Sequence, residues 1–230
     1  MIPKKIHYCW FGGKEKPESV LSFLETWRRT NPDYEIKEWN ESNFNYKDYT
    51  WSREAYSAKK WAYVSDVARI YALINEGGIY LDTDVEVLKS FDPYLKHHAF
   101  IGLENPYLIG TAVIGAEKGC EWLKEFFERY KVKSRHMITR RGVLSTKNNT
   151  AEITEFFASK FPNKLDVEIY DVDYFCGKLY YNKGLLYTSE NTVAIHHFEA
   201  TWMDNLSLMQ DIIRRIKFAY YRLKADIAGV

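Results

Sequence analysis

A long helical pattern, followed at once by a glycine pair and a short apolar run, constrains the fold more than any other part of the chain. Residues 57–76 carry apolar side chains at helical spacing, and the glycines at 77–78 predict the end of that helix. Residues 79–81 then predict a buried strand, which the acidic sequence Asp82-Thr83-Asp84 follows, with a bend before a second strand piece. A helix that leads into a buried strand is typical of an α/β fold.

The rest of the chain alternates between strand and helix patterns early and is irregular and β-rich later. Strands are predicted at 5–10, 34–39, 100–102, 112–115, 165–175 and 192–198, and helices at 17–31, 117–130 and 205–223. We therefore predict one α/β domain over residues 1–204, with a mixed, mostly parallel central sheet flanked by helices on both faces. Residues 205–230 are expected to form a basic amphipathic C-terminal helix.

Composition narrows the classes of function. The 32 Lys and Arg residues almost balance the 31 Asp and Glu residues over the 230 positions, so nothing indicates a nucleic-acid partner. The aromatic share of 17% suits sugar or base rings, and equally a Tyr-rich core. Cys9, Cys120 and Cys176 are widely spaced, which fits a reducing compartment and neither a disulfide framework nor a thiolate zinc site. Because no membrane span or signal peptide is evident, a cytoplasmic protein is expected.

The carboxylates of Asp82 and Asp84 are the leading candidates for chemistry. In extended chain, residues i and i+2 point the same way, so both would share one face at the carboxyl end of the strand. Open α/β sheets bind ligands at that edge. Two close carboxylates favour a hard cation such as Mg²⁺ or Mn²⁺, and hence a metal-bound phosphate. The same spacing recurs at Asp171 and Asp173, in a charged strand without a comparable approach, and no metal is expected there.

Polar residues on the preceding helix indicate a pocket next to the acidic pair. Ser65, Asp66 and Arg69 interrupt an otherwise apolar surface, and Asp66 and Arg69 stand at i and i+3. Such a pair is compatible with a simple helix salt bridge. Its position one helix before the acidic strand favours a role in a pocket.

Three segments in this order, KKIHYCWFGG, KKWAYVSDVARIYALINEGGIYLDTDVEVL and AIHHFEATW, resemble the DxD sugar-binding glycosyltransferases of family 32. That family includes bacterial capsule and O-antigen transferases and the yeast initiating mannosyltransferase, with the glucosyltransferase domains of large clostridial toxins as distant relatives. The resemblance implies a GT-A fold, a nucleotide-sugar donor that we expect to be UDP-linked, and a Mn²⁺ or Mg²⁺ ion on its diphosphate. It divides the domain into a nucleotide-sugar-binding part, 1–130, and an acceptor-side part, 131–204.

The resemblance also implies roles for individual residues. Trp10, with the adjoining backbone at Phe11 and Gly12, would hold the nucleotide base. Asp66 and Arg69 would hold the donor sugar, and Ser65 belongs to the same cofactor-binding set. Asp82 would contact ribose, sugar or metal, Asp84 would be the direct metal ligand, and His197 would approach the metal from the C-terminal side. Thr83, Thr201 and Trp202 complete the cofactor-binding set, and Asp66, Arg69, Asp82, Asp84 and Trp202 form the expected catalytic set. The ordinary alternatives are a late strand for His196 and His197, and core packing for Trp202.

The resulting hypothesis is a metal-dependent, retaining transferase that moves a hexose or N-acetylhexosamine to a cell-surface polysaccharide or lipid-linked oligosaccharide. A basic stripe over residues 206–224 permits either peripheral contact with the inner face of the membrane or packing on the domain. Two other classes stay open. One is a phosphohydrolase in which Asp82 is the nucleophile and Asp84 the acid, and the other is a non-catalytic glycan-binding module.

Overall fold

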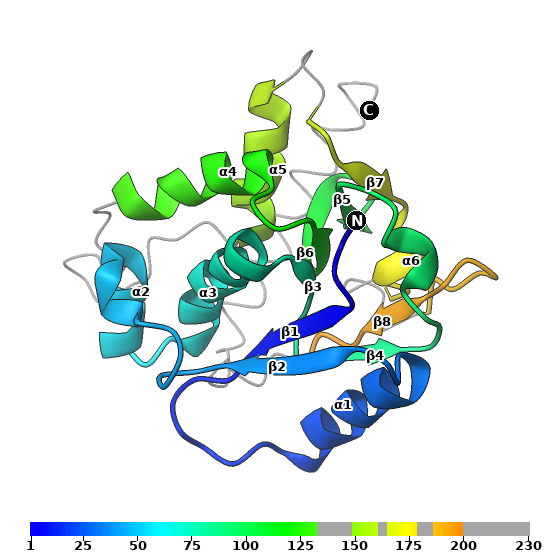
Figure 1. Cartoon of the computed structure of the whole chain (residues 1–230), viewed down its shortest axis with the longest axis horizontal. Coiled ribbons are helices and arrows are strands. Elements are labelled where there is room, and N and C mark those ends of the chain that lie inside the picture. Colours follow the sequence, from blue (N-terminus) through cyan, green and yellow to red (C-terminus); the bar gives the residue numbers. More distant parts are fainter. Residues whose placement is uncertain (133–148, 161–164, 179–185, 200–230) are drawn as a thin grey trace, which may run out of the picture. The chain divides into compact units, whose positions relative to one another are not determined.

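The computed structural model describes residues 1–132, 149–160, 165–178 and 186–199. Residues 1–198 form one unit around a six-stranded sheet in the order β2-β1-β3-β6-β5-β7 (Figure 1). The strands are β1 Lys5–Cys9, β2 Glu35–Trp39, β3 Gly78–Leu81, β5 Ala99–Asn105, β6 Leu108–Ala116 and β7 Glu168–Tyr170. Strands β1 and β2, β1 and β3, and β5 and β7 pair in parallel, whereas β6 is antiparallel to β3 and β5. The predicted mixed, mostly parallel sheet is therefore confirmed.

Helices cover both faces of this sheet (Figure 1). They are α1 Glu18–Thr30, α2 Thr50–Ser57, α3 Trp61–Glu76, α4 Glu121–Val132, α5 Asn149–Lys160 and α6 Val172–Phe175, with short 3-10 turns at Tyr46–Asp48 and Asp92–Tyr94. Alternation along β3 explains the two layers, because Tyr80 packs with α3 and α4 while Ile79 and Leu81 pack with α1 and α6. A separate ribbon of β4 Val85–Val87 and β8 Ala194–His196 lies with the second layer.

Three predicted elements differ from the structure. The helix predicted at 57–76 begins at Trp61, because Lys59 has a φ of 55° and separates α2 from α3. The strand predicted at 165–175 is limited to β7, since the Asp171 carboxylate accepts a hydrogen bond from the Val172 amide (2.7 Å) and starts α6. The predicted helix at 205–223 lies outside the described residues.

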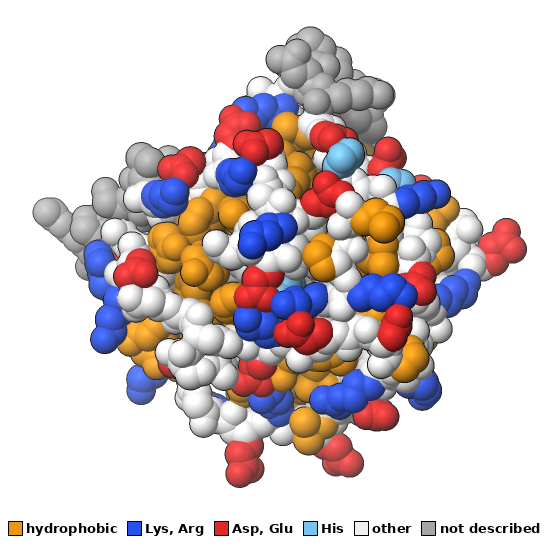
Figure 2. Space-filling view, in the orientation of Figure 1, with side chains coloured by type: hydrophobic (Ala, Val, Ile, Leu, Met, Phe, Trp, Pro, Cys, Tyr) orange, Lys and Arg blue, Asp and Glu red, His pale blue; other side chains and the backbone are white. Residues whose placement is uncertain are grey.

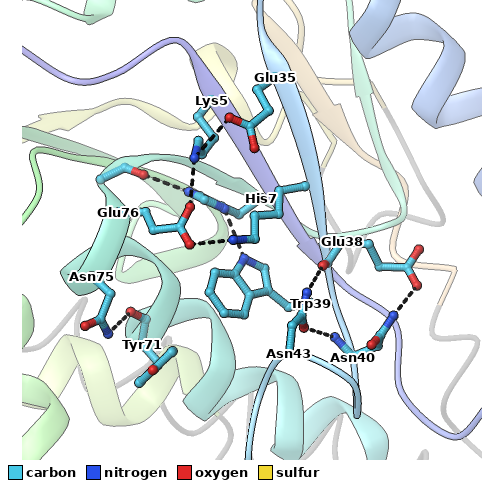
Figure 3. Close-up of polar contacts among 12 residues, drawn as sticks. Lys5, His7, Glu35, Glu38, Trp39, Asn40, Asn43, Tyr71, Asn75 and Glu76 are labelled. Atoms are coloured by element: carbon cyan, nitrogen blue, oxygen red, sulfur yellow. Dashed lines mark hydrogen bonds and ion pairs between the residues drawn. The ribbon is translucent and has the colours of Figure 1, made fainter.

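A buried histidine fixes the point where α3 turns into β3 (Figure 3). The indole nitrogen of Trp39 donates to Nδ1 of His7 at 3.0 Å, so the ring proton is on Nε2, which donates to the Gly77 carbonyl at 2.7 Å. Burial lowers the pKa of His7, and the ring is neutral. Gly78 has a φ of +112°, and a Cβ there would lie 2.6 Å from the Lys5 carbonyl oxygen. The junction therefore needs glycine and holds β3 in place.

The direction of the strands places the site. Because β3 and β5 are both antiparallel to β6, they run the same way, and β1 runs parallel to β3. The carboxyl ends of β1, β3 and β5 therefore share one edge, where Trp10, Asp82 and Glu104 lie. Figure 2 shows charges of both signs interspersed over the visible face, as the near-zero net charge predicts. Within the described ranges, no helix is both long and apolar enough to span a bilayer.

Candidate active site

The acidic sequence after β3 forms a tight turn. The Asp82 amide donates to the Ala112 carbonyl at 2.9 Å, which extends the pairing of β3 with β6 by one residue. The Val85 amide then donates to the Asp82 carbonyl at 3.1 Å and closes a turn through Thr83 and Asp84 into β4. The bend predicted between two strand pieces is confirmed. The extended chain that we expected to align the two carboxylates is replaced by this turn.

Three side chains converge at the turn in a way that fits a divalent cation. Asp82, Asp84 and His196 each offer one ligand atom, and these atoms lie within 4.8 Å of one another. Nε2 of His196 is 3.3 Å from Oδ1 of Asp84, whose charge raises the pKa of the imidazole against the opposing effect of burial. Two carboxylates provide the hard oxygen ligands of Mg²⁺ or Mn²⁺, and an imidazole nitrogen shifts the preference toward the transition metal.

The histidine beside Asp82 and Asp84 is His196, whereas the sequence predicted His197 in that place. The His197 ring lies 2.9 Å from Glu86 Oε2 and stacks on Phe23, with ring centroids 4.9 Å apart. Adjacent residues of an extended strand point to opposite sides, and His196 is the one that pairs opposite Val85 beside Asp84. The sequence pair His-His does not reveal which ring faces the acids, because β8 has only three residues and no clear apolar alternation.

Arg69 joins the acidic turn to the preceding helix. Its Nη2 lies 3.1 Å from Asp66 Oδ1 and 3.2 Å from Asp82 Oδ1, and its Nη1 donates to the Thr111 carbonyl at 2.7 Å. The guanidinium lies 4.7 Å from the centre of the Tyr80 ring, and its side chain is only 5% exposed. The Tyr80 hydroxyl also donates to Asp82 Oδ1, at 2.8 Å. The structure thus brings Asp66, Arg69 and Asp82 together in one buried network, as the sequence predicted.

The electrostatics of this network give one carboxyl group, that of Asp66, a pKa near neutral pH. Burial raises the pKa of Asp66 to about 7, although Arg69 opposes the shift; the nearby charge of Asp82 adds to it. The Asn149 side chain, at the start of α5, acts in the opposite direction by hydrogen bonding. Carboxyl groups with such shifted pKa values are concentrated at functional sites.

The residues expected to hold the nucleotide base follow β1. The Trp10 indole is partly exposed, and its nitrogen donates to the Lys14 carbonyl at 2.7 Å. Gly12 has a φ of +92°, and a Cβ there would lie 2.6 Å from the Trp61 indole, so glycine is required. The Phe11 side chain is 5% exposed and packs in the core, which leaves its backbone for the predicted contact with a base.

The remaining predicted site residues are distributed as follows. Ser65 is partly buried on α3, and its hydroxyl donates to the Trp61 carbonyl at 3.1 Å. Thr83 lies in the acidic turn, whereas Thr201 and Trp202 lie outside the described residues. The second Asp-x-Asp sequence is structural, since Asp171 caps α6 and Asp173 accepts a hydrogen bond from the Ser189 hydroxyl.

Two features of this edge were missed by sequence reasoning. One is the hydrogen bond from the Tyr80 hydroxyl to Asp82. The sequence signal for it is a tyrosine and an acid at positions i and i+2 at the end of a strand. Glu104, at the carboxyl end of β5, is the other. It lines a hollow together with His196, and the Thr150 hydroxyl donates to its Oε2 at 3.1 Å. The available signal was an acid at the end of a predicted strand.

Comparison with known proteins shows which proteins this chain is similar to. A family model described as "Glycosyltransferase sugar-binding region containing DXD motif" matches residues 17–101. Inositol phosphoceramide mannosyltransferase 3 of Schizosaccharomyces pombe is 33% identical over 130 residues, which are 53% of this chain and 35% of that protein. An uncharacterized glycosyltransferase of Acanthamoeba polyphaga mimivirus is 27% identical over 222 residues, 90% of this chain and 86% of that protein.

The fold agrees with these matches. The solved structure titled "PaToxG Glycosyltransferase" superposes with a TM-score of 0.52 at 17% identity and covers 70% of each chain. The chain therefore has a GT-A fold. Residues 17–101 match the DXD sugar-binding region of glycosyltransferases, with Asp82 and Asp84 as the acidic pair, and the predicted resemblance to DxD sugar-binding glycosyltransferases is confirmed. This chain spans about a third of the length of the fission yeast mannosyltransferase.

Proposed function

We propose that this protein is a metal-dependent, retaining glycosyltransferase that moves a hexose or N-acetylhexosamine from a nucleotide sugar to a glycan. The observation that carries the proposal is the convergence of Asp82, Asp84 and His196 beside the Arg69 network, at the edge where the parallel strands end. Asp84 and His196, with Asp82, would hold a Mn²⁺ or Mg²⁺ ion. When bound, that ion neutralises the charge that grows on the departing diphosphate.

The protein's own side chains position the acidic groups. Arg69 and Tyr80 both contact Oδ1 of Asp82, so among the described contacts Oδ2 is the oxygen that remains for a cation. Arg69 also orients Asp66, whose carboxyl would bind hydroxyls of the donor sugar. With a pKa near neutrality, Asp66 can accept or donate such a hydrogen bond. We name no covalent nucleophile, and we attribute retention to same-face attack in which the departing phosphate takes the proton of the acceptor.

The choice of donor and acceptor is part of the proposal. A UDP-sugar is our first candidate donor, and a cell-surface polysaccharide or a lipid-linked oligosaccharide is the candidate acceptor. The name of the fission yeast relative adds mannose as a sugar to test. A cytoplasmic location is supported by Cys9, Cys120 and Cys176, all of which are free thiols. The basic stripe at 206–224, through which the protein would contact the inner face of the membrane, lies outside the described residues.

The structure favours the transferase over the phosphohydrolase. In the phosphohydrolase Asp84 would have to act as a free acid, whereas its Oδ1 lies 3.3 Å from Nε2 of His196 in the candidate metal cluster. A glycan-binding module, the other alternative, does not need a metal cluster. Incubation with nucleotide sugars and Mn²⁺ separates the three classes.

We expect release of a nucleoside diphosphate that depends on Mn²⁺ and is lost in Asp84→Asn, with a product that keeps the anomeric configuration of the donor by NMR. Release of inorganic phosphate from simple phosphate esters, lost in Asp82→Asn, would instead support the phosphohydrolase. Sugar binding that is indifferent to chelator and nucleotide would support the binding module.

A further inference from the structure

Glu104 is an acidic residue of this edge for which the proposed function has no role. It lies at the carboxyl end of β5, and because β5 runs in the same direction as β3, Glu104 and Asp82 are on the same edge of the sheet. Strand β6 separates β5 from β3, so their backbones are about 10 Å apart. Ala112 and Val113 of β6 line the same hollow as Glu104 and His196, so this hollow lies between the two strands.

Glu104 lines the same hollow as His196, which places its carboxylate beside the candidate metal cluster. Burial raises the pKa of Glu104, and His196 opposes that shift, as does the hydrogen bond from Thr150. The charge of Asp82 adds to the upward shift. Glu104 is thus within electrostatic reach of two of the proposed metal ligands. It does not belong to the cluster of Asp82, Asp84 and His196 that could hold the ion, so it is available for another partner.

The floor next to Glu104 is made of very small residues. The hollow that Glu104 lines with His196 is also bordered by Gly102, Gly110 and Ala112. A Cβ at Gly110 would lie 3.3 Å from the Glu104 amide nitrogen and 3.4 Å from its Cβ, so a side chain there would press on Glu104. The absence of side chains on this floor keeps the hollow open beside the carboxylate.

We infer that Glu104 accepts a hydrogen bond from a hydroxyl of the donor sugar and so determines which sugar the enzyme takes. The inference rests on the proposed function. A donor held by its diphosphate at Asp82, Asp84 and His196 carries its pyranose ring directly on the β-phosphate, so the ring is the first part of the substrate to meet a carboxylate beside these ligands. Thr150 holds Oε2 at 3.1 Å and orients the group. The Glu104 oxygens accept hydrogen bonds, and a carboxyl group held in one orientation selects a correctly placed hydroxyl.

The test compares a nucleotide with its nucleotide sugars. Wild-type protein and Glu104→Gln are titrated in Mn²⁺ with UDP, GDP and a panel of UDP- and GDP-hexoses, including epimers and deoxy analogues. We expect Glu104→Gln to bind the preferred nucleotide sugar about 10- to 100-fold more weakly, with unchanged affinity for the bare nucleotide, because one hydrogen bond to a charged group is lost. The deoxy analogue that lacks the recognised hydroxyl should bind both proteins equally. Thr150→Val should show a smaller loss in the same direction.

Glu121→Gln is the matched control, since the Glu121 carboxylate is 89% exposed on α4. This variant should bind every ligand as the wild type does. Equal losses for nucleotide and nucleotide sugar in Glu104→Gln would place Glu104 on the metal or diphosphate and overturn the inference. Unchanged binding of all ligands would also overturn it. If wild-type protein binds no nucleotide in Mn²⁺, the proposed function itself fails, and the inference fails with it.

Discussion

Removal of the Arg69 guanidinium tests the buried network most severely. Arg69→Met keeps the length of the side chain and leaves the carboxylates of Asp66 and Asp82, 3.1 and 3.2 Å from Nη2, without their shared cation. Breaking a buried ion pair from one side costs about 3–5 kcal/mol. For a chain of this length, that loss lowers the melting temperature by roughly 6–20 °C. Arg69→Lys should lose less, because it keeps the charge without the forked geometry.

The cost of Arg69→Met should also depend on pH. The pKa of Asp66 in the folded protein, about 7, lies above its ordinary value of 3.8, so its contribution to stability is fully present below 3.8 and is lost as the pH rises through 7. Arg69 lowers that pKa, and its removal raises it further. The folded variant therefore binds more protons than the folded wild type. The difference in melting temperature between the two proteins should widen as the pH rises from 5.5 to 8.

Thermal unfolding at these two pH values, followed by tryptophan fluorescence, measures both effects. Arg28→Met is the control, since Arg28 is 56% exposed and its 3.5 Å contact with Glu25 should contribute at most about 0.5 kcal/mol. An Arg69→Met protein that melts with the wild type at both pH values would refute the buried network. A loss that is larger at pH 5.5 than at pH 8 would refute the reasoning on Asp66.

Three further predictions concern the sheet, the His7 junction and the cluster. Gly115→Ala should cost about 1–3 kcal/mol in chemical denaturation, because its Cβ would lie 2.0 Å from the Phe100 ring; wild-type stability would show that the strands adjust freely. Because burial lowers the pKa of His7, the stability that this residue contributes should be lost as the pH falls below 6.5. The melting temperature of His7→Gln should therefore fall less between pH 7 and pH 5 than that of the wild type. An equal fall in both proteins would contradict this. His196→Ala should weaken Mn²⁺ affinity at least 10-fold by calorimetry and His197→Ala much less, and the reverse order would restore His197 as the ligand.

The parts of the fold that the sequence predicts are those fixed by local patterns. The glycine pair at 77–78, the apolar run of β3 and the acids after it constrain one another through the chain itself, so their placement at a sheet edge was predictable. The separation of α2 from α3 depends on one left-handed residue, Lys59, which has no strong sequence signal. β7 is short because Asp171 caps a helix there, and an aspartate in that position is equally compatible with a strand.

The same distinction applies to the site. Asp66, Arg69 and Asp82 were predictable as a group because helix spacing and chain order bring them together. His196 reaches Asp84 only through the pairing of β4 with β8, which are separated by more than a hundred residues, so its choice over His197 needed the register. Glu104 enters the site because β6 lies between β3 and β5 in the sheet and is antiparallel to both. The order of strands in a sheet is not encoded in any single segment.

The most direct test of the metal-dependent transferase is calorimetric titration of wild-type protein with UDP-, GDP- and CMP-sugars, with and without Mn²⁺, beside Asp84→Ala. Asp171→Ala serves as a control from the second Asp-x-Asp sequence, which lies outside the cluster of Asp82, Asp84 and His196. We predict Mn²⁺-dependent binding of one nucleotide class that is lost in Asp84→Ala and retained in Asp171→Ala. Nucleotide-sugar binding that persists in Asp84→Ala, or that does not respond to Mn²⁺, would contradict a metal site at the acidic turn.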